Sequence, residues 1–397
     1  MKSKEELYQQ IIVACSAPNS VCIHRDKITP LISTVTDWQR LLQTATHLRA
    51  LPIVSDRLLN IAQQPTETSI PKAISEKMNN ALIAASVRYA RMTHALLLVM
   101  EALRRNNIEA LTYKGAVLAH TIYDTPSLRH FDDIDILVHN KDMSIARETI
   151  AKLGYQEIQK LPPSLEKSPF RPNRPYTMMS KDGSHTIDLA ATLHQSYYAP
   201  RLWESQIWDN RRMITLENTP IPTLSQETQL LYLCVHGAKH LWSRPSWIAD
   251  VAGILTTKKQ PDYQKTIQLA KKRDELKMLL IAASLAKEAY NIPLPPELTD
   301  KIHQDGTIQP LCKRITELQH NQIRGKGVSV KVRYKLQLHL RQHLHAKLRY
   351  TIKFALFIRE DEIRKINLPL PLHPLYYLIR PLRLITSSIQ RIIKYQS

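Results

Sequence analysis

Cysteine is scarce in this 397-residue chain, and its four cysteines form no CxxC pair and no cluster with metal-site spacing. Such usage is typical of free thiols in a reducing compartment, and it argues against a disulfide framework. Long apolar runs are also missing, because a stretch such as MLLIAASLA (278–286) is far shorter than the ~20 residues of a membrane span. The first residues, MKSKEELYQQ, lack the apolar core of a signal peptide. We therefore expect a cytoplasmic protein that at most lies on the surface of a membrane.

Acidic residues are outnumbered by basic ones, which gives a net charge of +20 and a pI near 9.7. The imbalance is concentrated near the C-terminus, where residues 321–397 hold 16 Lys and Arg against 3 acids. Such an excess favours anionic partners: nucleic acid, phosphorylated substrates or an acidic lipid surface.

Hydrophobic periodicity divides the chain into a small mixed α/β module between helical regions. We expect a helical region at 1–107, the α/β core at 108–224, a helical domain at 225–327 and a basic amphipathic helical tail at 328–397. The sequence thus predicts an α+β fold, with a small mixed-sheet core flanked by N-terminal and C-terminal α-helical regions.

Individual elements can be placed by the same periodicity and by turn and capping residues. Helices are expected at 86–107, 115–123, 141–154 and 225–242, the last with Ser225 as N-cap. Strands are expected at 108–114, 132–138 and 155–159, followed by a proline-rich loop and a hairpin at 176–191 that turns at Asp182–Gly183.

Two carboxylates stand side by side in the apolar run RHFDDIDILV (129–138). The alternation places Asp133 and Asp135 on one face of a strand and aliphatic side chains on the other. Neighbouring carboxylates repel each other unless a cation lies between them, and Mg²⁺ is the simplest such cation. Solvated acids on an exposed edge strand are the alternative, but the apolar opposite face favours an internal strand.

A third carboxylate, Asp188, stands alone in the strand-like stretch SHTIDLAA (184–191). If this hairpin strand packs beside the first, Asp188 joins Asp133 and Asp135 around the same cations. Three acids that hold two Mg²⁺ ions are the layout for in-line phosphoryl or nucleotidyl transfer.

A candidate phosphate site precedes the acids in YKGA (113–116), at the expected junction of a strand and a helix. Gly115 permits close approach of the backbone, the helix N-terminus offers free N–H groups, and Lys114 adds a positive charge. Arg129 either clamps a triphosphate or neutralises the acid cluster.

His236 and His240 lie four residues apart and so share one face of an expected helix. The spacing suits zinc, but Gly237 stands where a metalloprotease has its glutamate, and no third ligand is evident. Three interpretations stay open: core or capping histidines, a role in substrate binding with Lys239 nearby, and zinc binding.

Basic residues alternate with Leu, Ile and Tyr in the tail, in KVRYKLQLHLRQHLHAKLRY (331–350) and again in 368–395. Three interpretations stay open: a helix lying on anionic lipid, a nucleic-acid groove, or an ordinary basic face with leucines in the core. Lipid is favoured over nucleic acid because the tail is poor in stacking aromatics.

Taken in order, these motifs resemble the polymerase-β-like nucleotidyltransferase superfamily, and most closely a bacterial branch labelled uncharacterised nucleotidyltransferases. The resemblance covers about residues 90–255. Its motifs here are KGAVLAHTIYDTPSLRHFDDIDILV (114–138), Gly154–Tyr155, DLAATLH (188–194), HGAKHLW (236–242) and WIAD (247–250).

The resemblance implies a Mg²⁺-dependent enzyme, with two metal ions, that moves a nucleoside monophosphate from an NTP to a hydroxyl of a sugar, small molecule or protein. The implied roles are metal binding and catalysis for Asp133, Asp135 and Asp188; nucleotide binding for Lys114, Gly115, Ala116 and Arg129; and substrate binding for His236, Lys239 and His240.

Two departures from the pattern keep a second interpretation open. The superfamily has Gly-Ser where this chain has Gly115–Ala116, and the branch has a histidine soon after the third acid, whereas here it comes only at His194. The alternative is a catalytically degenerate adaptor that binds an anionic membrane or nucleic acid through its basic tail.

Overall fold

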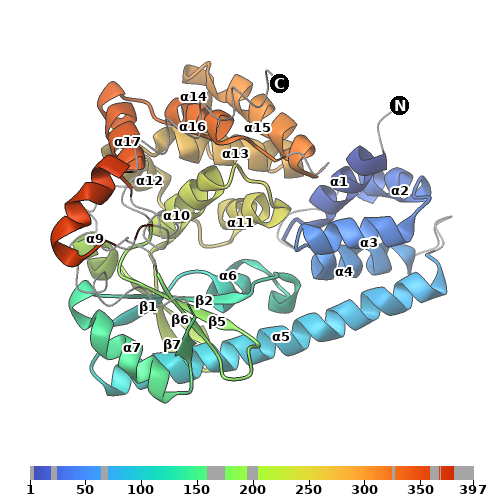
Figure 1. The fold of residues 1–397 in the computed structure, drawn as a ribbon. Coiled ribbons are helices and arrows are strands. Elements are labelled where there is room, and N and C mark those ends of the chain that lie inside the picture. The colour runs from blue at the N-terminus through green and yellow to red at the C-terminus, as the bar shows by residue number, and fades with distance from the viewer. Residues whose placement is uncertain are drawn as a thin grey trace.

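The N-terminal part of the chain is a helical bundle that leads into one very long helix. The computed structural model describes residues 4–18, 25–63, 70–158, 175–194, 204–323, 327–357, 366 and 368–379. In Figure 1 the short helices α1 to α4 gather at one end of the long helix α5, which runs beneath the sheet. These helices are α1 (Lys4–Cys15), α2 (Arg25–Ser33), α3 (Trp38–His47), α4 (Leu51–Ala62) and α5 (Lys72–Arg105).

A five-stranded mixed sheet forms the centre of the molecule, with strand order β1-β2-β5-β4-β3. Strands β2 and β5 run parallel, and the other neighbouring pairs are antiparallel. The prediction that the aspartate-bearing strand is internal is therefore confirmed. The strands are β1 (Ala110–Thr112), β2 (Asp133–Val138), β3 (Gln156–Glu157), β4 (Tyr176–Met179) and β5 (Thr186–Ala190).

The two faces of β2 enter different hydrophobic clusters, as its alternating sequence predicts. Ile134, Ile136 and Val138 pack in a cluster with α5 and α7, whereas Leu137, on the aspartate face, joins the larger helical cluster. The remaining elements of this part are α6 (Gly115–Ile122), η1 (Pro126–Leu128), η2 (Asn140–Asp142), α7 (Met143–Lys152), α9 (Glu204–Asp209), β6 (Arg212–Leu216) and β7 (Thr219–Thr223).

The C-terminal helices lie on the side of the sheet away from α5 (Figure 1). Helix α10 begins where predicted, because the Ser225 side chain accepts a hydrogen bond from the backbone N–H of Thr228. Buried residues of α1 and of α13 and α15 belong to one hydrophobic cluster, which joins the two helical regions. The helices are α10 (Gln226–Lys239), α11 (Pro245–Thr256), α12 (Tyr263–Arg273), α13 (Leu276–Tyr290), α14 (Pro296–Gln304), α15 (Ile308–Ile323), α16 (Val330–His339), α17 (Leu344–Leu356) and η3 (Leu370–Leu375).

The predicted α+β fold with helical flanks is confirmed, and so is the hairpin that turns at Asp182–Gly183, where Gly183 has φ +68°. Several element bounds differ from the prediction. The helix expected from residue 86 already begins at Lys72, and the strand expected at 155–159 is reduced to Gln156–Glu157. Most of the proline-rich loop lies outside the described residues, and the domain boundaries stay a prediction.

Helix α5 is long and apolar enough to cross a membrane by length and composition, with a window of mean hydropathy 1.2 that is 33% buried. Unbroken apolar runs alone do not identify α5 as a candidate membrane span, because charged residues interrupt its sequence. In the fold α5 packs against α4, α6, α7 and β1. Nine of its side chains are buried in these contacts, so α5 serves as a core helix here.

Candidate active site

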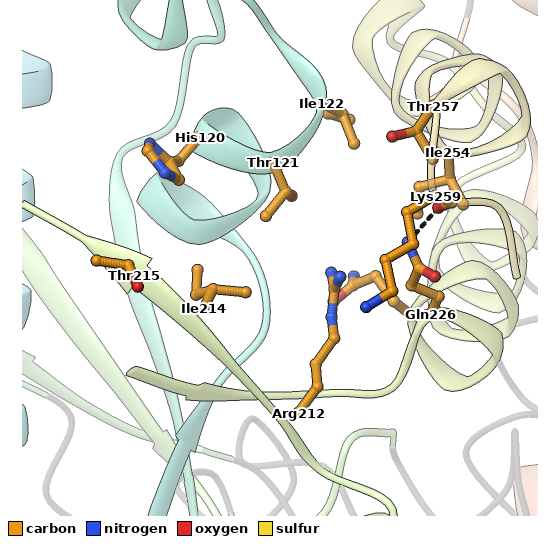
Figure 2. Close-up of a pocket in the computed structure, with 11 residues that line it drawn as sticks. His120, Thr121, Ile122, Arg212, Ile214, Thr215, Gln226, Ile254, Thr257 and Lys259 are labelled. Atoms are coloured by element: carbon orange, nitrogen blue, oxygen red, sulfur yellow. Dashed lines mark hydrogen bonds between the residues drawn. The ribbon is translucent and has the colours of Figure 1, made fainter. Parts of the chain in front are cut away.

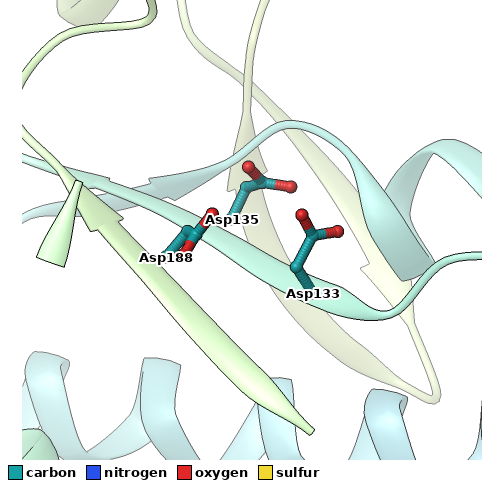
Figure 3. Close-up of side chains that lie close together, drawn as sticks. All are labelled: Asp133, Asp135 and Asp188. Carbon is teal, nitrogen blue, oxygen red and sulfur yellow. The ribbon is translucent and has the colours of Figure 1, made fainter. Parts of the chain in front are cut away.

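Three aspartates meet on the face of the sheet opposite α5. Asp133 and Asp135 project from β2, and the parallel register of β5 places Asp188 directly beside Asp135. One carboxylate oxygen of each lies within 4.8 Å of the others (Figure 3). Within the described residues, no other three His, Cys, Asp or Glu side chains are grouped in this way. The structure thus brings the three predicted acids together.

The triad is electrostatically strained without a cation. Burial raises the pKa of Asp135 to about 7, with Asp133 and Asp188 adding to the rise and Lys114 opposing it. Burial also raises the pKa of Asp188, although the Thr177 hydroxyl donates a 2.7 Å hydrogen bond to its Oδ1. The Oδ2 atom of Asp135 is buried and has no hydrogen-bond partner within the described part of the chain. An orphaned carboxylate oxygen between two further acids suits a divalent cation with oxygen ligands.

Lys114 and Gly115 border the triad, as predicted. Lys114 Nζ lies 2.6 Å from Asp135 Oδ1, and although burial lowers the pKa of this ammonium, Asp135 and Asp133 raise it overall. Gly115 begins α6 with φ +54°, and a Cβ there would lie 3.2 Å from the backbone oxygen of Asp133. Only glycine fits this conformation without strain. No side chain of the described residues caps the first turn of α6, so its N–H groups can bind an anion.

Arg129 has partners other than the predicted triphosphate. Its Nε and Nη2 donate hydrogen bonds of 2.9 and 2.8 Å to the two carboxylate oxygens of Asp250 on α11. Tyr123 donates a third bond, of 3.0 Å, to the same carboxylate. Asp250 is fully buried and Arg129 is 9% exposed. We call Tyr123, Arg129 and Asp250 the buried clamp.

The buried clamp corrects the role assigned to Arg129. Burial lowers the pKa of its guanidinium, but the charge of Asp250 raises it overall, so the group stays charged within the ion pair. Its Nη1 donates to the backbone oxygen of Gly115 at 3.4 Å. Arg129 is therefore placed to hold the Gly115 turn rather than to reach a nucleotide.

The predicted histidines form part of a cluster of rings. His236 and His240 have centroids 4.9 Å apart, and Trp247 of α11 contacts both, at 5.4 and 4.9 Å. On the other side Tyr232 stacks on His236 and on His194. We call these five residues the ring cluster. None of its histidines belongs to a metal-holding group of described residues.

The histidines of the ring cluster are neutral at ordinary pH. Burial lowers the pKa of His194 and of His240 to about 3, with the charge of Lys239 adding to both effects. Burial also lowers the pKa of His236 far below its usual value, and Lys114 contributes to that shift. Neutral imidazoles can both donate and accept hydrogen bonds, so they suit a polar substrate.

Sequence reasoning missed Tyr232, Trp247 and Thr177 as neighbours of the site. Tyr232 could have been found, because it precedes His236 by one helical turn and so shares its face. Trp247 stands in the WIAD motif, but its contact with α10 depends on how two helices pack. Thr177 lies opposite Asp188 in the hairpin register, which follows from a turn at Asp182–Gly183.

Gly237 explains why α10 ends as it does. A Cβ at this position would lie 2.2 Å from Nε1 of Trp242. The chain turns through left-handed conformations at Leu241 and Trp242, and the Trp242 N–H donates to the Gly237 carbonyl at 2.8 Å. The indole thereby packs against the helix, fully buried, beneath the ring cluster.

The sheet has a parallel strand pair with three converging acids, and the helix that begins at Gly115 lies beside them. This combination defines a nucleotidyltransferase-like class of protein. Comparison with known families agrees. A family described as uncharacterised nucleotidyltransferase matches residues 34–291, which is well over half of the chain, and the chain belongs to this family. The match extends from α3 through α13, beyond the motifs themselves. No curated protein matches the chain.

Proposed function

We propose that this protein is a Mg²⁺-dependent nucleotidyltransferase that moves a nucleoside monophosphate from an NTP to a hydroxyl-bearing acceptor. The observation that carries the proposal is the convergence of Asp133, Asp135 and Asp188 within 4.8 Å beside the free N-terminus of α6. Membership of a nucleotidyltransferase family supports it.

The roles follow from the positions of the side chains. Asp133, Asp135 and Asp188 would hold two Mg²⁺ ions, which supply positive charge to the phosphates and to the attacking oxygen. Lys114 and the N-terminal turn of α6 would bind the triphosphate, since ammonium and backbone N–H groups both suit phosphate oxygens. The Thr177 hydroxyl donates a hydrogen bond to one oxygen of Asp188. This bond would orient the carboxylate as a metal ligand and as the acceptor of the hydroxyl proton.

The ring cluster, with Lys239, would form the acceptor side of the site. Tyr232 is buried and the other four rings are half-buried, and the imidazoles are neutral, so a hydroxyl can exchange hydrogen bonds with them without a charge to desolvate. Flat rings also stack on the faces of sugars and bases. The acceptor would be a sugar, a small molecule or a protein side chain.

Calorimetric titration with Mg²⁺ and each NTP tests the assignment. Asp133→Asn with Asp135→Asn should abolish metal-dependent NTP binding while the circular dichroism spectrum stays that of the wild type. Asp132→Asn is the matched control: this neighbouring aspartate is 46% exposed and pairs with Arg49 and His130, outside the triad. Unchanged Mg·NTP binding in the double variant would refute the assignment.

Label transfer separates an enzyme from a degenerate adaptor. The protein is incubated with Mg²⁺, cell extract and each NTP labelled at the α-phosphate. Transfer of label to any acceptor, lost in Asp133→Asn with Asp135→Asn, supports the enzyme. No transfer from all four nucleotides favours the adaptor.

Helix α17 supports a second proposal, contact with the inner face of an anionic membrane. Its aliphatic side chains at every fourth position are exposed: Leu344 82%, Leu348 58%, Ile352 47% and Leu356 36%. Residues 327–357 contain no Asp or Glu but seven Lys and Arg. A basic helix with an exposed apolar stripe is typical of binding in the lipid interface.

One of the predicted lipid-facing arginines is not available. Arg341 is 3% exposed and stacks over the ring of Tyr350 at 3.8 Å, so it belongs to the packing between α16 and α17. The exposed Lys331 and Lys335, with the half-buried Arg333, Lys347 and Arg349, would carry the proposed contact with lipid.

Liposome co-sedimentation tests the membrane proposal. Binding to anionic vesicles should exceed binding to neutral ones and fall as salt is raised, because exposed charges are screened over ~10 Å at 0.1 M salt. Leu344→Ser with Leu348→Ser should weaken it. Ile83→Ser, at an equally exposed position of α5, is the control. Equal binding of the tail variant, or binding to RNA in place of vesicles, would contradict the proposal.

A further inference from the structure

A cavity of about 290 Å³ lies apart from the triad, at the opposite end of α6. It is enclosed by the last turn of α6, by β6, by the first turn of α10 and by the segment that follows α11 (Figure 2). Its volume is near the lower limit of small-molecule pockets, ~300 Å³. Its ionisable lining residues are all basic in type: His120, Arg212 and Lys259.

Arg212 and Lys259 extend into this cavity toward one another from opposite walls (Figure 2). Arg212 is held through its side-chain Nε and Lys259 through its backbone carbonyl. Arg212 Nε donates to the carbonyl of Leu224 at 3.1 Å, and the Lys259 carbonyl accepts a hydrogen bond from the side chain of Gln226. Two basic side chains that converge on one cavity favour an anionic ligand.

No carboxylate of the described residues forms an ion pair with Arg212 or Lys259. Burial lowers the pKa of Arg212, and the nearby charge of Glu227 only opposes that effect. The Glu227 carboxylate itself accepts the backbone N–H of Asp262 at 3.1 Å. The free nitrogens of Arg212 and Lys259 are therefore available to a ligand.

Helix α10 contributes two further hydrogen-bond donors to the wall of this cavity. Gln229 is 3% exposed and lines the cavity, and its side-chain nitrogen has no hydrogen-bond partner among the residues that the structure describes. A buried amide left unbonded costs free energy that a ligand oxygen would recover. The N-terminus of the 14-residue helix α10 opens at the same place and adds its positive end.

We propose that this cavity binds a small phosphate-bearing molecule at a site separate from the triad. The guanidinium of Arg212 offers its Nη nitrogens as a fork, the Lys259 ammonium supplies a point charge, and Gln229 supplies a neutral donor. This combination matches the several oxygens of a phosphate group. The proposal rests on this cavity alone and holds whether or not the triad is active.

Isothermal titration of the full chain with inorganic phosphate, at constant ionic strength and without Mg²⁺, tests the proposal. Saturable binding is expected, and Lys259→Ala should weaken it at least fivefold. Arg212→Ala with Lys259→Ala should abolish it. Lys258→Ala is the matched control, because this neighbouring lysine is exposed and does not line the cavity; its affinity should stay within twofold of the wild type.

Two more arms fix the place and the ligand class. Lys114→Ala should leave phosphate binding unchanged, which separates the cavity from the triad. Succinate should bind at least tenfold more weakly than phosphate. If the Arg212 variant fails to fold, the exposed Lys259→Glu replaces it and should abolish binding. The proposal is overturned if the wild type shows no saturable binding, if only Lys114→Ala removes it, or if succinate binds equally well.

Discussion

Asp250→Asn should strongly destabilise the protein, although Asp250 is no part of the triad. The substitution keeps the size of the side chain but removes its charge from the buried clamp, in which Asp250 is fully buried. Arg129 then stays buried and charged without a counter-ion, while Tyr123 keeps an oxygen to bond.

The magnitude follows from burial and geometry. Breaking a buried, hydrogen-bonded ion pair by removal of one partner costs about 3–5 kcal/mol. The two bonds of 2.8 and 2.9 Å between Arg129 and Asp250 are close to ideal, so we expect a value within this range. Typical domains have about 5–15 kcal/mol of stability, so a large fraction is lost.

A double-mutant cycle measured by urea unfolding isolates the interaction. Arg129→Met alone should cost a similar amount, because it leaves the Asp250 carboxylate unpaired. Arg129→Met with Asp250→Asn removes both charges and should cost about 2 kcal/mol less than the sum of the two single changes, because neither charge is then left buried without its partner. Arg314→Ala, which breaks an exposed pair with Glu317, is the control and should cost under ~1 kcal/mol.

The result also bears on the active site. Arg129 Nη1 holds the Gly115 carbonyl, so Asp250→Asn should weaken Mg·NTP binding even at temperatures where the variant is folded. Additive costs in the cycle, or a loss under ~1 kcal/mol for Asp250→Asn, would refute the interpretation of the buried clamp as a strong ion pair.

Three further changes can be predicted. Gly237→Ala should cost at least ~1–3 kcal/mol in urea unfolding, since its Cβ would lie 2.2 Å from Trp242 Nε1, and a silent substitution would contradict that packing. The folded-state pKa values of His194 and His240, near 3, lie below the unfolded value of ~6.5. As the pH falls, the unfolded chain therefore binds protons before the folded chain does. The free energy of unfolding should be constant above pH ~6.5 and should fall as the pH drops toward 3, by up to ~1.4 kcal/mol per pH unit for each histidine. His240→Gln should reduce that slope. The thiols of Cys15, Cys234 and Cys312 are buried with raised pKa values, about 12 for Cys15, so they should react with Ellman's reagent only after unfolding; rapid reaction of any of these three, assigned by peptide mapping, would contradict their burial.

The sequence is sufficient for the triad because strand geometry is local. Side chains alternate along a strand, so Asp133 and Asp135 had to share a face, and the turn at Asp182–Gly183 determined which side chains of the hairpin oppose each other. What remained open was whether β5 pairs with β2. In the structure these two strands pair in parallel, which places Asp135 beside Asp188.

The buried clamp could not be predicted from local pattern. Arg129 and Asp250 are separated by 121 positions, and their pairing depends on how α11 packs over α6. In the sequence, an arginine before two aspartates is equally consistent with a phosphate ligand and with a buried ion pair. Only its burial in the fold distinguishes these two roles. The ring cluster was hidden for the same reason, because His194, His236 and Trp247 come from three separate segments.

The Gly115–Ala116 departure weighs less against catalysis than the sequence alone indicates. Ala116 is 3% exposed and packs in the cluster that holds Phe131 and Ile134, on the apolar side of β2. A serine there would bury its hydroxyl beside hydrocarbon, at a cost of about 1–3 kcal/mol without a partner. The triphosphate site proposed beside the triad needs the backbone N–H groups of α6 and the charge of Lys114, and both are present there. Alanine thus suits the apolar packing at this position, and its presence leaves the three carboxylates of the triad and the N-terminus of α6 in place.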